Sequence, residues 1–251
     1  MARGLFIGLG AAGAAAAAVT TGVYVNESGK AARALAAATR AAPETVCIES
    51  NVRLVEGMAP GCRTAAQYEA LRDRAVIDGA GAAVALNLKA PETGGDDATA
   101  RTCAEFDGLT EKGWYAYSAA DMRREDYFIR ACGALSYLSK ARPARSTYFT
   151  GGKASLEDIR SMAVAEATGF GEAGPSVAVD VTGIADRVWK VGIGQGETTV
   201  YEIAHADFTG DGLGEILAYL SVGAAGGTAR SGAVGMLEKT TEGGSCVFRA
   251  R

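Results

Sequence analysis

The chain has few histidines, prolines and aromatic residues, and it has no excess of positive charge. His205 is the only histidine among 251 residues, which excludes histidine-rich zinc sites and leaves few routes to histidine-based catalysis. The 29 acidic and 25 basic side chains give a formal net charge of −4, so there is no positive field to hold a phosphate backbone. We therefore expect no nucleic-acid partner.

Large apolar side chains are also scarce. The chain contains 51 alanines and 34 glycines, so about a third of its positions have almost no side-chain surface to bury. The hydrophobic content of 48% therefore overstates the apolar surface that a core could bury. A length of 251 residues is nevertheless sufficient for a sizeable core, and a net charge of −4 is too small to force disorder. These numbers favour a folded domain whose core contains few large apolar side chains.

The first 25 residues have the pattern of an export signal. Arg3 precedes an uncharged stretch from Gly4 to Val25, which contains the apolar run Leu5 to Leu9 and small residues suited to cleavage at Ala16 to Ala18. Residues 1–25 are predicted to be a signal peptide of a periplasmic or secreted protein. An uncleaved anchor in the inner membrane is the alternative, with membrane contact only through this segment. A buried alanine-rich helix of a cytosolic protein remains a third possibility.

All five cysteines lie beyond this segment, where an oxidising compartment would let them pair. No Cys-x-x-Cys spacing occurs, so zinc ribbons and thioredoxin-like redox chemistry lack their motif. Proximity in sequence suggests the pairs Cys47 with Cys62 and Cys103 with Cys132, which leaves Cys246 as a free thiol. Sequence alone does not determine this connectivity, and five buried thiols in a reducing cell are the alternative.

The rest of the chain divides into an alanine-rich stalk and one domain. Residues 26–43 have high helix propensity but little to bury, and they predict a helical stalk that Pro43 ends. Residues 44–251 are predicted to form a single α+β domain, with mixed helices and strands followed by an antiparallel β-sheet. The expected helices span 64–75, 119–141 and 155–166. The expected strands span 45–54, 82–88, 176–181, 187–193, 198–206, 215–222, 233–239 and 246–249.

One loop between two of the expected strands has the spacing of a metal site. It runs from Asp207 to Glu215 as Asp-Phe-Thr-Gly-Asp-Gly-Leu-Gly-Glu, with side-chain oxygens at positions 1, 3, 5 and 9. A hard divalent cation takes six to eight oxygens, and alternate positions of a tightly curled loop point inward. We expect Ca²⁺ as a possible cofactor, held by the side chains of Asp207, Thr209, Asp211 and Glu215 and the carbonyl of Leu213.

The loop resembles the calcium loops of FG-GAP, VCBS and dockerin-like modules over these nine residues. The resemblance implies the same five oxygen donors. Thr209 departs from the usual Asn or Asp, and Ala218 stands where an EF-hand has its bidentate glutamate, so an EF-hand is not supported. The alternative interpretation is a simple turn in which Asp207 and Thr209 bond the local backbone.

The chemistry of the remaining residues favours binding over catalysis. The nucleophile motifs Gly-x-Ser-x-Gly and Ser-x-x-Lys are missing from the sequence. Trp114, Tyr115 and Tyr117 are expected to pack against the long helix, with stacking on sugars as the alternative. A basic patch of Arg130, Lys140, Arg142 and Arg145 could meet an anionic envelope polymer, or could be cations at a helix end.

The C-terminal half also resembles exported bacterial proteins of unknown function. The sequence therefore favours an exported, non-catalytic envelope protein with no catalytic or cofactor-binding residues assigned, whose partner is an unidentified envelope protein or polymer. An exported metal-assisted hydrolase that uses Asp and Glu, with His205 as a further candidate, is the alternative.

Overall fold

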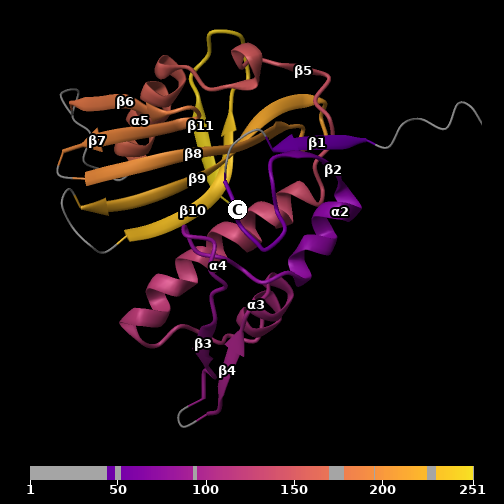
Figure 1. The fold of residues 1–251 in the computed structure, drawn as a ribbon. Coiled ribbons are helices and arrows are strands. Elements are labelled where there is room, and N and C mark those ends of the chain that lie inside the picture. Colours follow the sequence, from indigo (N-terminus) through magenta and orange to yellow (C-terminus); the bar gives the residue numbers. More distant parts are fainter. Residues whose placement is uncertain are drawn as a thin grey trace, which may run out of the picture. The chain divides into compact units, whose positions relative to one another are not determined.

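The fold is known from a computed structural model of the chain (Figure 1). It describes residues 44–48, 52–92, 95–169, 178–194, 196–224 and 230–250. The expected signal peptide or anchor of residues 1–25 and the expected stalk of residues 26–43 lie outside the described residues. From Glu44 onward the chain forms one compact unit.

The C-terminal half is an antiparallel meander in which each strand pairs with the next along the chain (Figure 1). Its strands are β6 (Val179–Ala185), β7 (Val188–Ile193), β8 (Gly196–Ala206), β9 (Leu213–Ala224), β10 (Arg230–Glu238) and β11 (Val247–Ala250). The predicted change from a mixed N-terminal part to an antiparallel sheet is confirmed, and the protein is an α+β protein.

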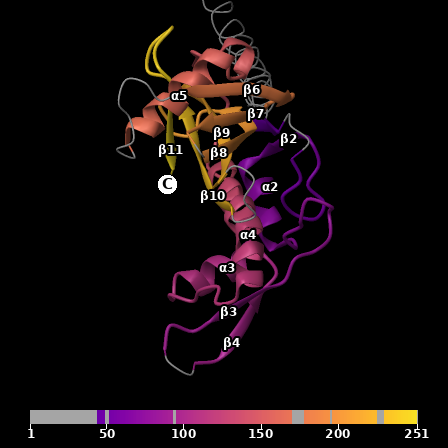
Figure 2. The same ribbon diagram turned by 90° about the vertical axis from the view of Figure 1, so that its left-hand side faces the viewer.

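Helices cover both faces of this sheet. Side chains alternate along its central strands, so each face has its own apolar side chains to pack against a helix. On β9, Leu217 and Tyr219 belong to a core that includes Phe128 of α4 (Ala119–Leu138). Ile216 and Ala218, which alternate with them along β9, belong to a second core that includes Ile159 of α5 (Leu156–Gly169). The two helices can be followed in Figure 2. The sheet is therefore buried on both sides in spite of the small share of large apolar residues.

The N-terminal part consists of short elements that contact α4 and the end of the sheet. Strand β1 continues the sheet through the pair Ile48 and Ala204 on β8, and β1 also pairs with β2. The elements are β1 (Thr45–Ile48), β2 (Gly61–Thr64), α2 (Ala65–Ala70), the 3₁₀ helix η1 (Leu71–Asp73), β3 (Leu86–Lys89), β4 (Asp97–Ala100) and α3 (Cys103–Thr110). The connection after α4 contains β5 (Ser146–Thr147) and the 3₁₀ helix η2 (Thr150–Gly152).

Several boundaries expected from the sequence are wrong in this part. The helix expected over 64–75 ends as an α-helix at Ala70 and continues as η1. The strand expected over 45–54 stops at Ile48, and β2, β4 and α3 were not expected. Met122 recurs with Phe128 at the spacing of an inward helical face, yet it is 56% exposed in the first turn of α4. Tyr117 is likewise 66% exposed, and Tyr115 is 45% exposed.

Two disulfides join cysteines that are neighbours in sequence. Cys47 and Cys62 lie opposite each other in the β1–β2 pair, and Cys103 at the start of α3 is bonded to Cys132 of α4. Cys246 is free and buried. The predicted pairing is confirmed. Within the described ranges, no helix has the length and apolar character needed to cross a bilayer.

Candidate functional site

The loop that connects β8 to β9 is held in place by the segment that follows α4. Arg142 and Asp207 exchange two backbone hydrogen bonds, each 2.9 Å long. Further along, the N–H of Arg145 donates to the carbonyl of Gly212 over 2.9 Å, and β5 runs parallel to the start of β9. These bonds fix both ends of the loop, so its carboxylates are attached to a rigid frame.

The loop curls tightly around the carboxylate of Asp207. Gly210 and Gly212 have φ values of 88° and 91°, a backbone conformation that residues with a Cβ adopt only at a cost. Their N–H groups donate to the two oxygens of Asp207 over 2.6 Å and 3.0 Å. The Oδ1 of Asp211 accepts the N–H of Leu213 over 2.8 Å. The glycines therefore provide the curl that the sequence pattern predicts.

Glu215 closes the other side of the loop and is 6% exposed. Its Oε2 accepts the N–H of Phe208 over 2.9 Å, and its Oε1 accepts the hydroxyl of Thr209 over 3.2 Å. Burial raises the pKa of Glu215, the two hydrogen bonds oppose this rise, and the nearby charges of Asp211 and Asp207 add to it. The carboxyl is thus in a place where its negative charge is poorly compensated.

The structure brings three of the five expected metal-binding residues together. One carboxylate oxygen each from Asp207, Asp211 and Glu215 lies within 4.8 Å of the others. Thr209 is beside them, with its hydroxyl on Glu215. Leu213 opens β9, where it lies opposite Ser146. The arrangement is a cluster of carboxylate oxygens that could hold a divalent cation, since each of these oxygens keeps a lone pair beyond its hydrogen bond.

A polar hollow of about 280 Å³ adjoins the cluster. Asp207, Asp211, Gly210 and Gly212 form one wall. The other lining residues are Glu44, Arg142, Pro143 and Arg145. Sequence reasoning missed this hollow because Glu44 precedes β1 and the arginines follow α4, and no local pattern connects these segments with the loop.

His205 lies on β8 two residues before Asp207, but it lines neither this hollow nor the groove described below. Its ring packs against the backbone of Gly152 and Gly214, where a Cβ at Gly214 would collide with the ring and with Ala144. This close packing is typical of a structural residue.

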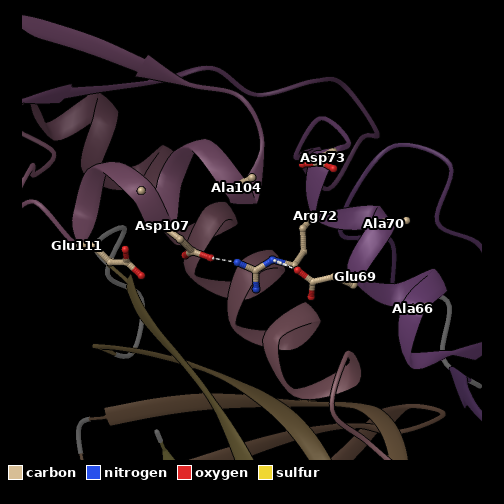
Figure 3. A pocket seen from close by; sticks show the side chains of 9 residues that line it. Ala66, Glu69, Ala70, Arg72, Asp73, Ala104, Asp107 and Glu111 are labelled. Carbon is tan, nitrogen blue, oxygen red and sulfur yellow. Dashed lines mark hydrogen bonds and ion pairs between the residues drawn. The ribbon is translucent and has the colours of Figure 1, made fainter.

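A second concavity, of about 580 Å³, lies between α2 with η1 on one side and α3 on the other (Figure 3). Arg72 crosses it to form ion pairs with Glu69, 3.3 Å away, and with Asp107. Asp73 and Glu111 add further negative charge. The remaining lining residues are small: Ala66, Ala70, Ala104 and Gly108. The groove is open and acidic, and the sequence did not indicate it.

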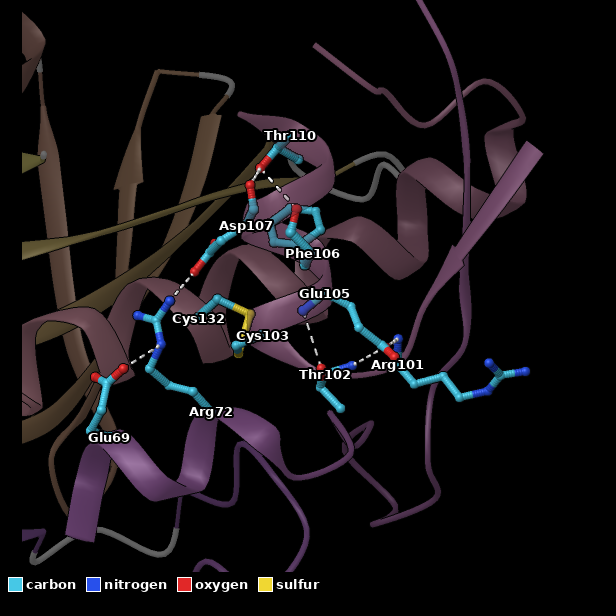
Figure 4. Close-up of a disulfide and its surroundings, with 10 residues drawn as sticks. All are labelled: Glu69, Arg72, Arg101, Thr102, Cys103, Glu105, Phe106, Asp107, Thr110 and Cys132. Atoms are coloured by element: carbon cyan, nitrogen blue, oxygen red, sulfur yellow. Dashed lines mark hydrogen bonds and ion pairs between the residues drawn. A yellow bond between two sulfur atoms is a disulfide. The ribbon is translucent and has the colours of Figure 1, made fainter. Parts of the chain in front are cut away.

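The walls of this groove are anchored by a disulfide and by caps (Figure 4). Cys103 and Cys132 tie α3 to α4. Thr102 and Glu105 form a capping box, in which the Thr102 hydroxyl accepts the Glu105 N–H over 3.2 Å and Glu105 accepts the Thr102 N–H over 3.1 Å. The acidic cluster in the loop and the acidic groove are thus two separate features of a disulfide-bonded domain.

Comparison of the chain with protein families, with curated proteins and with solved structures finds no match. The interpretation of both features therefore depends on their own geometry.

Proposed function

We propose that this protein is an exported, non-catalytic binding or structural component of the bacterial envelope, and that its 207–215 loop binds Ca²⁺. The observation that carries the proposal is the convergence of the Asp207, Asp211 and Glu215 carboxylates within 4.8 Å. The resemblance of the loop to FG-GAP, VCBS and dockerin-like calcium loops points to the same residues.

Electrostatics supports a bound cation. Asp207 and Glu215 are 4% and 6% exposed, so water screens their mutual repulsion poorly. Two charges less than 5 Å apart repel by about 3–4 kcal/mol at an effective dielectric constant of about 20. A divalent ion between these carboxylates would turn this repulsion into attraction.

Two disulfides support export, because such bonds persist in the periplasm and outside the cell and are rare in the cytosol. Those compartments also supply free Ca²⁺. With three carboxylates and no twelfth-position ligand, we expect a dissociation constant in the range of roughly 10⁻⁴ to 10⁻³ M.

Calcium should therefore stabilise the fold, and replacement of Asp211 by Ala should remove this effect. At about 10 mM Ca²⁺ and a dissociation constant of about 0.3 mM, the gain in unfolding free energy is about 2 kcal/mol. The measurement is the melting temperature in Ca²⁺ and in EDTA, together with direct titration of Ca²⁺ by calorimetry.

Asp78→Ala is the matched control for this experiment. Asp78 Oδ1 also accepts backbone N–H groups in a turn, from Ala80 and Ala82, each over 2.9 Å. Its loss should lower stability equally with and without Ca²⁺, whereas Asp211→Ala should abolish the difference between the two conditions. A wild-type protein that takes up no Ca²⁺ at 10 mM would refute the proposal.

A further inference from the structure

Two arginines beside the loop contribute positive charge to the lining of the hollow. Arg142 and Arg145 share its wall with Glu44, Asp207 and Asp211, yet among the described residues neither guanidinium forms a salt bridge. Two cations that border a carboxylate cluster without pairing to it can bind an anion from solution.

The arginines are attached to a rigid support. The backbone of Arg142 is bonded twice to Asp207, that of Arg145 is bonded to Gly212, and Pro143 stiffens the short segment between them. The aliphatic stem of Arg145 lies along Gly212, where a Cβ would meet its Cδ at 3.4 Å. The backbone positions of both arginines are therefore set before any ligand binds, which lowers part of the entropic cost of binding, and their exposed side chains remain accessible to an anion.

The net charge of the side chains around the hollow determines whether an anion can bind there. The carboxylates of Glu44, Asp207, Asp211 and Glu215 outnumber the two arginines, so without an ion this region has an excess of two negative charges and repels anions. One Ca²⁺ in the loop cancels that excess. Affinity for an anion should therefore depend on Ca²⁺.

We propose that the Ca²⁺-loaded hollow binds a phosphate monoester, with the phosphate between the ion and the guanidinium groups of Arg142 and Arg145. The inference rests on the proposed Ca²⁺ site. Asp207 and Asp211 line both the cluster and the hollow, so an ion that they hold lies at the wall of the hollow. Three carboxylates leave positions open on an ion that takes six to eight oxygens.

Phosphate suits this setting by its shape and charge. Its tetrahedral oxygens point in several directions, so one group can reach both the ion and two guanidinium forks, whereas a carboxylate offers two oxygens in one plane. A hollow of about 280 Å³ accommodates a phosphate and the first atoms of the group that it esterifies.

The test is calorimetric titration of the full-length protein with glycerol phosphate, in 5 mM Ca²⁺ and in EDTA. We expect glycerol phosphate to bind in the presence of Ca²⁺ and its affinity to be at least tenfold lower in EDTA. By thermodynamic reciprocity, saturating glycerol phosphate should tighten Ca²⁺ binding by the same factor. Vesicles that contain phosphatidic acid, compared with vesicles of phosphatidylcholine alone, distinguish a lipid source of the phosphate from a soluble one.

Substitution of the arginines completes the test. The double variant Arg142→Gln/Arg145→Gln should lose at least tenfold in affinity for glycerol phosphate while its affinity for Ca²⁺ alone stays within about threefold. Arg123→Gln, which changes an exposed arginine at the start of α4, should behave like the wild type.

The two proposals fail in different ways. If Ca²⁺ binds but neither glycerol phosphate nor phosphatidic acid does, the phosphate site is refuted and the Ca²⁺ site stands. Equal phosphate binding in EDTA, or binding that survives the double substitution, also refutes the phosphate site. If Ca²⁺ itself does not bind, the proposed function fails as well.

Discussion

The strongest single test of the packing concerns the buried ion pair between Glu202 and Arg187. Glu202 is 1% exposed, and its Oε2 lies 3.5 Å from Arg187, while its Oε1 accepts the indole N–H of Trp189 over 2.7 Å. Arg187 also donates to the carbonyl of Gly152 over 3.1 Å, so the pair connects the β6–β7 turn with the η2 segment. Truncation of either partner changes several contacts at once.

Replacement of Glu202 by Ala leaves the Arg187 charge buried without its carboxylate. Loss of one partner of a buried pair costs about 3–5 kcal/mol, and we expect the free energy of unfolding in urea to fall by that amount. Arg187 has a φ of 60°, a conformation that glycine adopts freely. The double variant Glu202→Ala/Arg187→Gly removes both the charge and the strain, so it should be more stable than Glu202→Ala alone.

The exposed pair between Lys190 and Glu197, 2.7 Å apart on the neighbouring part of β7 and β8, is the control. Because the Lys190 side chain is 50% exposed, Lys190→Gln should cost no more than about 1 kcal/mol. If Glu202→Ala costs as little as Lys190→Gln, or if the double variant is no better than the single one, the argument for a buried, coupled pair is wrong.

The same carboxyl predicts a pH dependence. Burial raises the pKa of Glu202, and its bonds to Trp189 and Ala154 and the charges of Arg187 and Lys153 offset only part of this rise. Between the unfolded and the folded pKa the native state binds more protons than the unfolded state, so this group's contribution to stability is complete below the unfolded pKa and is lost as pH rises through the folded pKa. Glu202→Gln should remove this decline, which begins above the unfolded glutamate pKa of about 4.3, from the profile of unfolding free energy against pH.

Two further substitutions test the anchoring of α4. Replacement of Cys103 and Cys132 by Ser should lower the free energy of unfolding in urea by about 2–4 kcal/mol, because the crosslink restricts the unfolded chain; equal stability of oxidised and reduced wild type would contradict this. Tyr219→Phe removes the hydroxyl that donates to Asp126 Oδ2 over 2.6 Å, and it should cost about 1–3 kcal/mol in the same assay, because the other oxygen, Oδ1, already lacks a partner among the described residues. An unchanged unfolding midpoint for Tyr219→Phe would show that the carboxylate is solvated.

The sequence was most informative where local patterns suffice. The strands of the C-terminal meander follow from short β-type runs separated by glycine-rich turns, and α4 follows from its helical period; the structure adds Ser118 as its N-cap. The disulfides were predicted from nearness in the chain, and Cys47 and Cys62 are indeed opposite each other in a β-hairpin. In these cases the interactions that decide the structure lie within about 30 residues.

The failures arise where a local signal was missed or where contacts between distant segments decide the structure. Helix α3 carries the capping box of Thr102 and Glu105, a signal that could have located it, although Gly108 lowers its helix propensity. Met122 has helical spacing, but its side chain is exposed in the first turn of α4. The 207–215 motif was recognisable, whereas the wall of Arg142, Arg145 and Glu44 depends on segments far apart in the chain.

The order of the cysteines has a consequence for how the chain matures. Each disulfide joins a cysteine to the next one in sequence, so if the chain is exported as proposed, an oxidase that acts on it from the N-terminal end would form the native bonds without any reshuffling. Cys246 emerges last, and burial raises its pKa to about 12, so once β11 has docked its thiol is too weakly ionised to attack the bonds already made. On the proposed route of export, we therefore expect the native disulfides to form with an oxidant alone and without an isomerase.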